Sequence, residues 1–418
     1  MSYADLSRAQ LAKLVPELLL SGQLIDRSGM AHCIAAFGRE TMAQIAIEEW
    51  MAASPVYTGR MRTALQIDGD GVADMFKCLQ LDIGAPPQFM DFRYTIFDKY
   101  HGEFVLNHCG ALMDVEPMGD DYVTSMCHDI EDPTFDATAI ATNRRARIRP
   151  IHRPPRRPAD QHPHCAWTVT IEPDREELPL PPESIEISKT RAATLELSPI
   201  DPENEGHGDY VGPVWEDLRF EDWSHSALVR IAEEVALQHH LLALGFLMSV
   251  RGKTDEDKAA EIFRKQLTGI SGLTADRLRK CLGLGQGAED LAAVLRVHPI
   301  LGPDQYADTE VSVHGTGESA IVRLRIPADS SAVADGGWLA HIDPDHLEPV
   351  LAMATGVDLT WSAVTGYRDG GDVVVEIAHA EAIKELGEVA IARFSGGSTF
   401  EFADRGIPLS ITPVNTGA

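Results

Sequence analysis

The sequence predicts an α+β protein of two tandem, similar halves, each a helical bundle packed on a small antiparallel sheet, arranged as a pseudo-dimer. Hydrophobic residues make up 44% of the 418 residues, enough for one large core or two ordinary ones. Helix-prone and strand-prone stretches follow one another in the order helices, strands, helices, strands. Short segments of the first half also match segments of the second half in the same order, as a duplication would leave them.

The first half opens with helices and continues with strands. Within residues 3–80, ETMAQIAIEEWMAA has apolar residues at helical spacing, and YTGRMRTALQIDGDGVADMFKCLQL is typical of two short helices joined at a glycine-rich turn. Three later runs are expected to form strands: FRYTIFDKYHGEFVLNHC, DDYVTSMC and CAWTVTIE. Between the last two, IEDPTFDATAIAT is expected to form a helix that begins at Asp132 and Pro133.

The second half repeats this order. Residues 225–300 are predicted to be helical, and residues 308–378 to contain strand, strand, helix and strand in ESAIVRLRI, GGWLAHI, PDHLEPVLAMAT and DVVVEIAH. Three pairs of segments match between the halves. They are GRMRTALQI with ADRLRKCLGL, VADMFKCLQL with AEDLAAVLRV, and residues 31–38 with residues 238–245, which places His32 over His239.

A segment rich in proline and acidic residues separates the two halves, a composition typical of a linker. We therefore predict an N-terminal α+β half of residues 1–180, a linker of residues 181–220 and a degenerate C-terminal α+β half of residues 221–418. One large domain, in which the halves pack together across this crossover, is compatible with the same pattern.

The charge of the chain excludes several classes of partner. Its 64 acidic residues exceed its 36 basic residues by 28, so it repels a polyanion unless its cations gather on one face. The arginine run within residues 144–168 lacks interleaved aromatic residues, so we expect no nucleic-acid partner. An apolar span of about 18 residues and a signal peptide are both missing from the sequence, which predicts a cytoplasmic protein with no membrane partner.

Three cysteines are candidates for a site. Cys109 and Cys127 end predicted strands and Cys165 begins one, so strands meeting at one sheet edge would bring the thiols together near His128 or His164. Three thiolates and an imidazole form a tetrahedral zinc shell, and sulfur ligands also suit iron. The sequence therefore predicts zinc or iron bound by the three cysteines and His128, although their spacing matches no standard motif.

Two other interpretations of these cysteines stay open. They are either small hydrophobic residues of the core, or one of them, Cys127 or Cys165, is a nucleophile whose pKa a neighbouring histidine or arginine lowers. The second half is predicted to keep the fold without cysteines at the corresponding positions, which favours a site confined to the first half.

The first half resembles a known family. The residues that carry the likeness are Pro154-Pro155, His162-Pro163 and Cys165-Ala166-Trp167, which follow two segments that each end in cysteine. They resemble a bacterial family grouped with L-2-amino-thiazoline-4-carboxylic acid hydrolases, over about residues 20–172. The resemblance implies a fold akin to the 4-vinyl reductase ligand-binding domains and hydrolysis of a ring carbon–nitrogen bond. Members of this family are usually single-copy, unlike the present chain.

These observations predict a hydrolase that acts on a ring C–N or amide bond of a small, carboxylated metabolite. Cys127 is the candidate nucleophile or metal ligand, and His128 and His164 are the candidates for moving protons. The arginine run would deliver Cys165 to the site and place Arg153 and Arg156 beside it.

Alternatives remain for the arginines and for the function. The arginines are also explained as cations that neutralise the protein's own acidic surface, and His32 and Trp167 either contact the substrate or pack in the core. Two other functions fit: a non-enzymatic binding or sensor protein for a lipid-like, steroid-like or anionic metabolite, and a lyase or isomerase of lipid or steroid breakdown. A homodimer is compatible with each of them.

Overall fold

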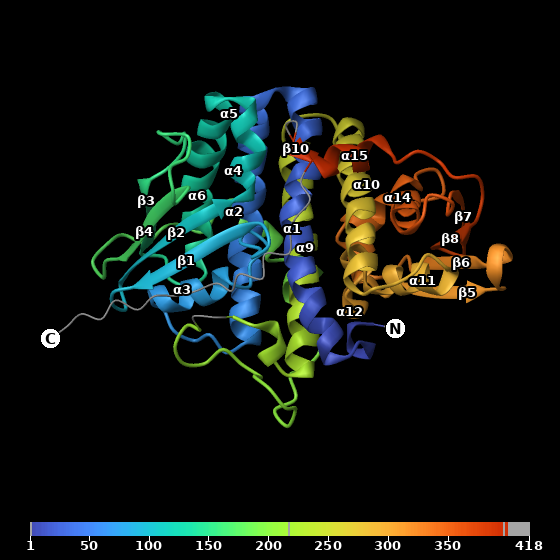
Figure 1. Cartoon of the computed structure of the whole chain (residues 1–418), viewed down its shortest axis with the longest axis horizontal. Helices are drawn as coiled ribbons and strands as arrows, with labels where there is room; N and C mark the ends of the chain where they lie inside the picture. Colours follow the sequence, from blue (N-terminus) through green and yellow to red (C-terminus); the bar gives the residue numbers. More distant parts are fainter. Residues whose placement is uncertain (1, 216–217, 396–397, 400–418) are drawn as a thin grey trace.

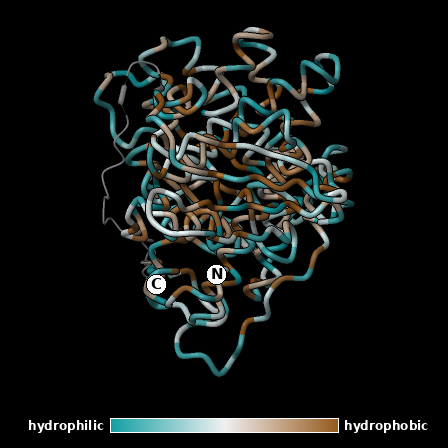
Figure 2. The backbone as a smooth tube through the Cα atoms, turned by 90° about the vertical axis from the view of Figure 1, so that its right-hand side faces the viewer, coloured by the Kyte–Doolittle hydropathy of each residue, from teal (hydrophilic) through white to brown (hydrophobic). Residues whose placement is uncertain are grey.

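The computed structural model describes residues 2–215, 218–395 and 398–399. Within them the chain is an α+β protein, with four long helices in the middle and a four-stranded antiparallel sheet on either side (Figure 1). The long helices are α1 (Arg8–Phe37), α2 (Arg39–Ala64), α9 (His225–Arg251) and α10 (Glu256–Cys281). Hydrophobic stretches gather in the interior and hydrophilic ones follow the outer loops (Figure 2). The predicted fold class is confirmed.

Capping side chains determine where three of the long helices begin. Ser7, Ser224 and Asp255 each accept a hydrogen bond from the backbone N–H three residues further along, at the starts of α1, α9 and α10. A side-chain oxygen at this position pairs one of the backbone donors that the first helical turn leaves unpaired. Among the described helices, none combines the length and the apolar composition needed to cross a bilayer.

The first sheet lies beside α2 and has the strand order β1-β2-β4-β3 (Figure 1). Its strands and the helices around them are, in chain order, α3 (Val72–Leu79), β1 (Met90–Ile96), β2 (His101–Cys109), α4 (Gly110–Val115), η2 (Glu116–Met118), α5 (Asp120–Thr124), η3 (Ser125–Ile130), α6 (Glu131–Ile140), β3 (Ala146–His152) and β4 (Cys165–Ile171). The segment η3 is π-helical and leads directly into α6, which packs against both α2 and β3.

The second sheet repeats this topology on the other side of the molecule, with the strand order β5-β6-β8-β7. Its elements are α11 (Ala288–Val297), η5 (Pro299–Leu301), α12 (Asp304–Ala307), β5 (Glu310–His314), η6 (Gly317–Ser319), β6 (Ile321–Ile326), α13 (Ser331–Ala334), η7 (Trp338–His341), α14 (Glu348–Val357), β7 (Ala363–Asp369) and β8 (Asp372–Ala378). Each half therefore has two long helices, a short helix, a hairpin, a helical insertion and two further strands in the same order, which supports the inferred duplication.

Two segments predicted to be strands are helical instead. DDYVTSMC forms α5 and the first half of η3, because Val123, Cys127 and Ile130 are buried at the spacing of one helical face. GGWLAHI contains η7, in which the adjacent Trp338 and Leu339 are both buried, so the alternation of a strand is missing. The edge strands β3 and β7 were not predicted, and several of their side chains are exposed.

The four long helices cross in a two-fold pattern. α1 packs against α9 and α10, and α9 packs against α1 and α2. Counted from the capping residues Ser7 and Ser224, Gly22 and His239 hold the same position, and a Cβ at Gly22 would lie 2.9 Å from His239 Nε2. Equivalent residues meet where a two-fold axis passes, which supports the pseudo-dimer. The predicted correspondence of His32 with His239 is wrong.

The connection between the halves is folded against the helices. It contains α7 (Pro182–Ile187) and α8 (Arg191–Thr194), both of which contact α2 and α9. Further along, the Tyr210 N–H donates to the Leu65 carbonyl at 2.8 Å. Buried apolar residues of this connection and of both halves form one continuous core. Residues 181–220 have the composition of a linker, but the described residues among them, 181–215 and 218–220, pack as part of the body.

The chain returns to the central helices after β8. There α15 (Gly387–Arg393) contacts α1 and α10. The short strands β9 (Phe394–Ser395) and β10 (Ser398–Thr399) follow it along the chain. Near the start of the chain, η1 (Tyr3–Asp5) precedes α1, and η4 (Phe220–Asp222) precedes α9. α15 thus brings a late part of the chain next to the first long helix.

Candidate functional site

A cavity of about 290 Å³ lies in the first half, between α1, α2, the β1–β2 hairpin and the helical segment α4 to α6. This volume is near the lower end of the range typical of small-molecule sites. Most of its wall is apolar or aromatic, as in the side chains Met30, Met42, Trp50, Phe89, Phe92 and Phe135. The wall also contains charged residues, which are described next.

Two of the charged groups in the wall have clear partners. The Arg27 guanidinium donates through Nε to Asp114 at 3.0 Å and forms an ion pair with it. Asp82 accepts hydrogen bonds from the Tyr57 hydroxyl at 2.9 Å and from the Gly84 backbone N–H at 2.6 Å. Burial raises the pKa of Asp82 to about 6, because these two donors offset only part of the desolvation.

Asp26 and Glu49 form a buried pair of acids at the inner end of the wall. The Trp50 indole N–H donates to Asp26 at 2.8 Å, and burial raises the pKa of Asp26. Glu49 is fully buried behind it, and the two carboxyl groups share a hydrogen bond. Burial, and then the nearby Asp26, raise the pKa of Glu49 well above its usual value. We expect Glu49 to hold a proton at neutral pH.

Glu131, the first residue of α6, is the third unusual acid of the wall. Its pKa is raised to about 8, first by burial and then by Asp132, while Arg153 offsets part of the increase. No described residue donates a hydrogen bond to its carboxyl group. A carboxyl group with a pKa near neutrality, facing a cavity, can both donate and accept a proton.

The three candidate cysteines lie next to Glu131. Cys109 ends β2 and Cys165 begins β4, and these antiparallel strands place both residues at the same edge of the sheet. Cys127 approaches from η3, and its pKa is raised by burial and then by Glu131, Cys109 and Cys165. The thiols are thus near enough to interact, as the positions of Cys109 and Cys165 at strand ends predicted.

The chemistry expected of these thiols differs from what the structure favours. A lowered pKa was predicted for Cys127 or Cys165, but burial raises both because a thiolate is poorly solvated in the core. Within the described part of the chain, no group of three or more histidine, cysteine or acidic side chains is arranged to hold a metal ion. The side chains as placed do not fit a zinc or iron shell.

The candidate histidines form structural hydrogen bonds. The His128 Nε2–H donates to the Pro154 carbonyl at 2.7 Å, and His164 Nδ1 accepts from the Cys109 backbone N–H at 3.1 Å. Burial, and then Arg156, lower the pKa of His164 to about 4, so this ring is neutral. These contacts account for the position of the two rings near the cysteines. They give neither ring a role in proton transfer.

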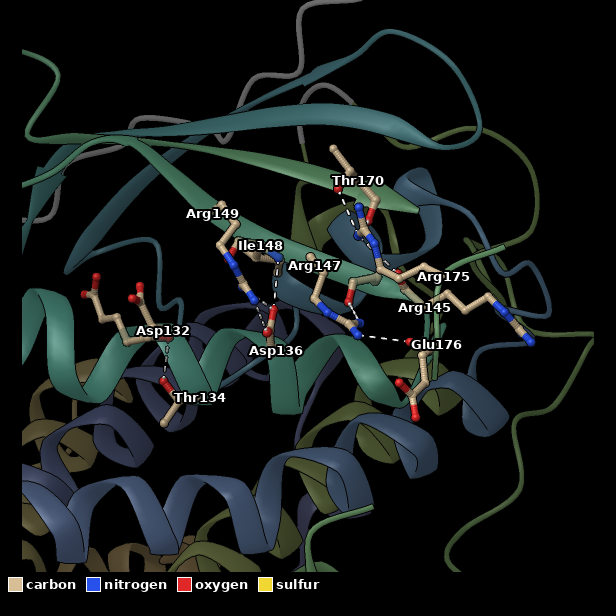
Figure 3. Close-up of polar contacts among 12 residues, drawn as sticks. Asp132, Thr134, Asp136, Arg145, Arg147, Ile148, Arg149, Thr170, Arg175 and Glu176 are labelled. Carbon is tan, nitrogen blue, oxygen red and sulfur yellow. Dashed lines mark hydrogen bonds and ion pairs between the residues drawn. The ribbon is translucent and has the colours of Figure 1, made fainter. Parts of the chain in front are cut away.

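The arginine run binds the protein's own acidic groups. Arg153 pairs with Asp132 at 2.5 Å, and Arg156 forms a two-fold contact with Glu116, with both hydrogen bonds at 2.7 Å. Figure 3 shows the same behaviour along β3, where Arg149 binds Asp136 through two hydrogen bonds of 2.9 Å. These contacts support the interpretation that the arginines neutralise acidic groups of the same chain.

The remaining candidates pack in the core or lie outside the cavity. Trp167 is fully buried against Phe104 and Phe135, with ring centroids 6.3 and 4.8 Å away. His32 is on α1, where burial and Lys265 of α10 lower its pKa. None of the residues proposed from the sequence lines the cavity, whereas Phe135, next to Trp167, does.

Sequence reasoning missed Asp26, Glu49 and Glu131. A trace of Asp26 and Glu49 is present in the sequence, because both lie among apolar residues in helical stretches, LLLSGQLIDRSGM and IAIEEWMAA. An acid on the apolar face of a helix is rarely buried without a role or a partner.

The second half shows that the fold does not need these acids. α2 and α10 are both 26 residues long, and counted from their first residues Glu49 corresponds to Gln266. Counted from the capping serines of α1 and α9, Asp26 corresponds to Ala243. Both replacements are uncharged and almost fully buried. The same architecture therefore forms with neutral side chains in place of the acid pair.

The second half also fills space that the first half leaves open. Ala46 of the cavity wall corresponds to Phe263 of α10, which is fully buried and stacks against Phe246 with ring centroids 6.3 Å apart. Comparisons of the chain with protein-family models, curated proteins and solved structures found no match. The resemblance found in the sequence stays a prediction.

Proposed function

We propose that the protein binds a small, predominantly apolar molecule in the cavity of its first half. The cavity itself, about 290 Å³ and lined by methionine and aromatic side chains, is the observation that carries this proposal. A cavity of roughly 150 Å³ admits benzene, so this one suits a molecule of about two rings or a branched chain of similar size. The presence of Phe263 where the first half has Ala46 supports a space kept open for a ligand.

Hydrolysis of a ring C–N or amide bond is the second candidate function, favoured by one observation. Glu131 lines the cavity and lies beside Cys109, Cys127 and Cys165, with a pKa near 8. A carboxyl group of this kind fits the role of general acid and base that the sequence assigned to His128 and His164. In this version Glu131 takes a proton from water and returns it to the departing nitrogen, and the thiols remain protonated neighbours.

Titration with an uncharged two-ring fluorophore, 1-aminonaphthalene, tests the binding function. We expect saturable fluorescence in the wild-type protein. Ala46→Phe, which copies Phe263, should weaken binding at least about tenfold by occupying the cavity. Ala36→Phe, at an exposed position of α1, is the control for added aromatic surface and should bind like wild type. Absence of saturable binding, or equal binding by Ala46→Phe in a protein that melts normally, would contradict the proposal.

A further inference from the structure

Four side chains of the cavity wall use their hydrogen-bond donors within the protein. The Trp50 N–H is engaged by Asp26 at 2.8 Å, and Arg27 is engaged in its ion pair. The hydroxyl groups of Thr134 and Thr138 donate to backbone carbonyls of their own helix at 2.8 and 3.1 Å. A ligand group that needs donors, such as a carboxylate, therefore finds these four side chains already committed.

One hydrogen-bond acceptor of the wall, in contrast, lacks a partner. The carboxyl group of Glu131 accepts no hydrogen bond from any described residue. Asp26 is engaged, because it accepts from Trp50 and shares a hydrogen bond with Glu49. A buried polar group without a partner is unfavourable, so a ligand that donates to the Glu131 carboxyl group would relieve that cost.

We propose that the ligand is an apolar molecule that carries a basic nitrogen, and that the carboxyl group of Glu131 binds its ammonium group. This inference rests on the proposed binding function of the cavity. An ammonium group offers up to three donors and a positive charge, and the aromatic ring of Trp50 in the same wall adds a favourable face for a cation.

The charges around the cavity favour a cation over an anion. The wall contains the acids Asp26, Asp82, Asp114 and Glu131 against the single guanidinium of Arg27, which Asp114 neutralises. Arginines of the run form ion pairs with acidic residues of η2, α5 and α6. The net charge of −28 also raises the local concentration of cations around the protein. The carboxylated substrate expected from the sequence would meet repulsion here.

The affinity of the cavity for an amine should rise with pH, whereas its affinity for a neutral ligand should not. Burial raises the pKa of Glu131 to about 8, so in the empty cavity this group is mostly protonated at pH 6. An ammonium ion needs the carboxylate, so its affinity rises with pH between 6 and 8, while an alkyl amine itself stays charged up to about pH 10. The charged or titratable groups that act on Glu131, or on which it acts, are Asp132, Arg153, Cys109, Cys127 and Cys165.

Competition against the bound fluorophore separates the ligand classes. The three competitors are 3-phenylpropylamine, 3-phenylpropanol and 3-phenylpropanoate, which share one apolar body and differ in the polar group. At pH 8 we expect the amine to compete at least about tenfold better than the alcohol, and the propanoate to compete worst. The advantage of the amine should shrink by about fivefold or more at pH 6.

Two variants assign the effect to Glu131. Glu131→Gln should reduce the advantage of the amine over the alcohol, measured as the ratio of their affinities for the same variant, to about threefold or less. Asp132→Asn, next to Glu131 but outside the wall, is the control and should keep the advantage.

Each outcome separates the inference from the function on which it rests. If the fluorophore does not bind the wild-type protein, the binding function and the inference are both overturned. If the fluorophore binds but the alcohol competes as well as the amine, or Glu131→Gln keeps the amine's advantage, only the inference is overturned. If the propanoate competes best, the cavity is a site for anions, as the sequence predicted.

Discussion

Replacing Glu49 by glutamine should stabilise the protein at neutral pH. The carboxyl group is fully buried, and its pKa lies well above the usual 4.5, so the folded chain keeps a proton that the unfolded chain releases. Between pH 4.5 and the folded pKa, the folded state binds more protons than the unfolded state, so the free energy of unfolding falls as pH rises. Each pH unit costs about 1.4 kcal/mol. At pH 7 the cost is therefore at most about 3 kcal/mol, the value reached when the folded group is still fully protonated.

Glutamine has nearly the same shape and cannot ionise, so Glu49→Gln removes this cost. Urea unfolding at pH 5, 6 and 7 measures it: the gain should be below about 1 kcal/mol at pH 5 and should increase with pH, to no more than about 3 kcal/mol at pH 7. Gln266→Glu is the matched control, because it places a carboxyl group at the equivalent position of α10. It should destabilise the protein with the same pH dependence and the opposite sign.

Loss of stability in Glu49→Gln at pH 7 would refute this reasoning, because it would mean that the carboxylate is ionised and stabilised by a partner. A gain that does not change with pH would also refute it, since the effect would then have no link to proton binding.

Three further predictions test other parts of the structure. Because burial raises the pKa of Cys127, its thiol should react with a disulfide reagent far more slowly in the native protein than in urea; reaction at the rate of a free thiol in native buffer would contradict this. Gly245→Ala should destabilise the protein by about 1–3 kcal/mol, since its Cβ would lie 2.8 Å from the Glu49 carbonyl oxygen, and an unchanged melting temperature would show that α2 and α9 can move apart. Arg156→Ala should lower stability by about 1 kcal/mol or less and leave fluorophore binding unchanged; weaker binding would place the guanidinium at the ligand.

Much of the fold could be predicted because periodicity and element order are local properties. The helical spacing in ETMAQIAIEEWMAA lies within α2, and the order of helices and strands recurs in both halves. The short runs DDYVTSMC and GGWLAHI were misassigned because a few apolar residues fit a strand and a buried helical turn equally well. Packing against neighbouring elements decides between a strand and a helical turn. A short stretch of sequence carries no information about that packing.

The candidate site was only partly predictable. Cys109 and Cys165 meet because strand ends at one sheet edge lie together, which follows from the antiparallel pairing of β2 and β4. Burial of Asp26 and Glu49 depends on α9, whose Gly245 allows it to approach α2 closely. No local pattern in the first half states that a helix nearly two hundred residues later will cover an acid, so the sequence points to the thiols and misses the carboxyl groups.

The cavity of the first half is completed by a residue from far along the chain. Ile391 of α15 contributes to its wall, because α15 returns from the second sheet to contact α1. During synthesis the rest of the wall leaves the ribosome well before this residue, so a chain interrupted after the second sheet would contain every other part of the pocket with one side open. Retention of a ligand would then show that both halves have been synthesised and have packed together. The second half would thus determine when the cavity can hold a ligand, in addition to supporting the fold.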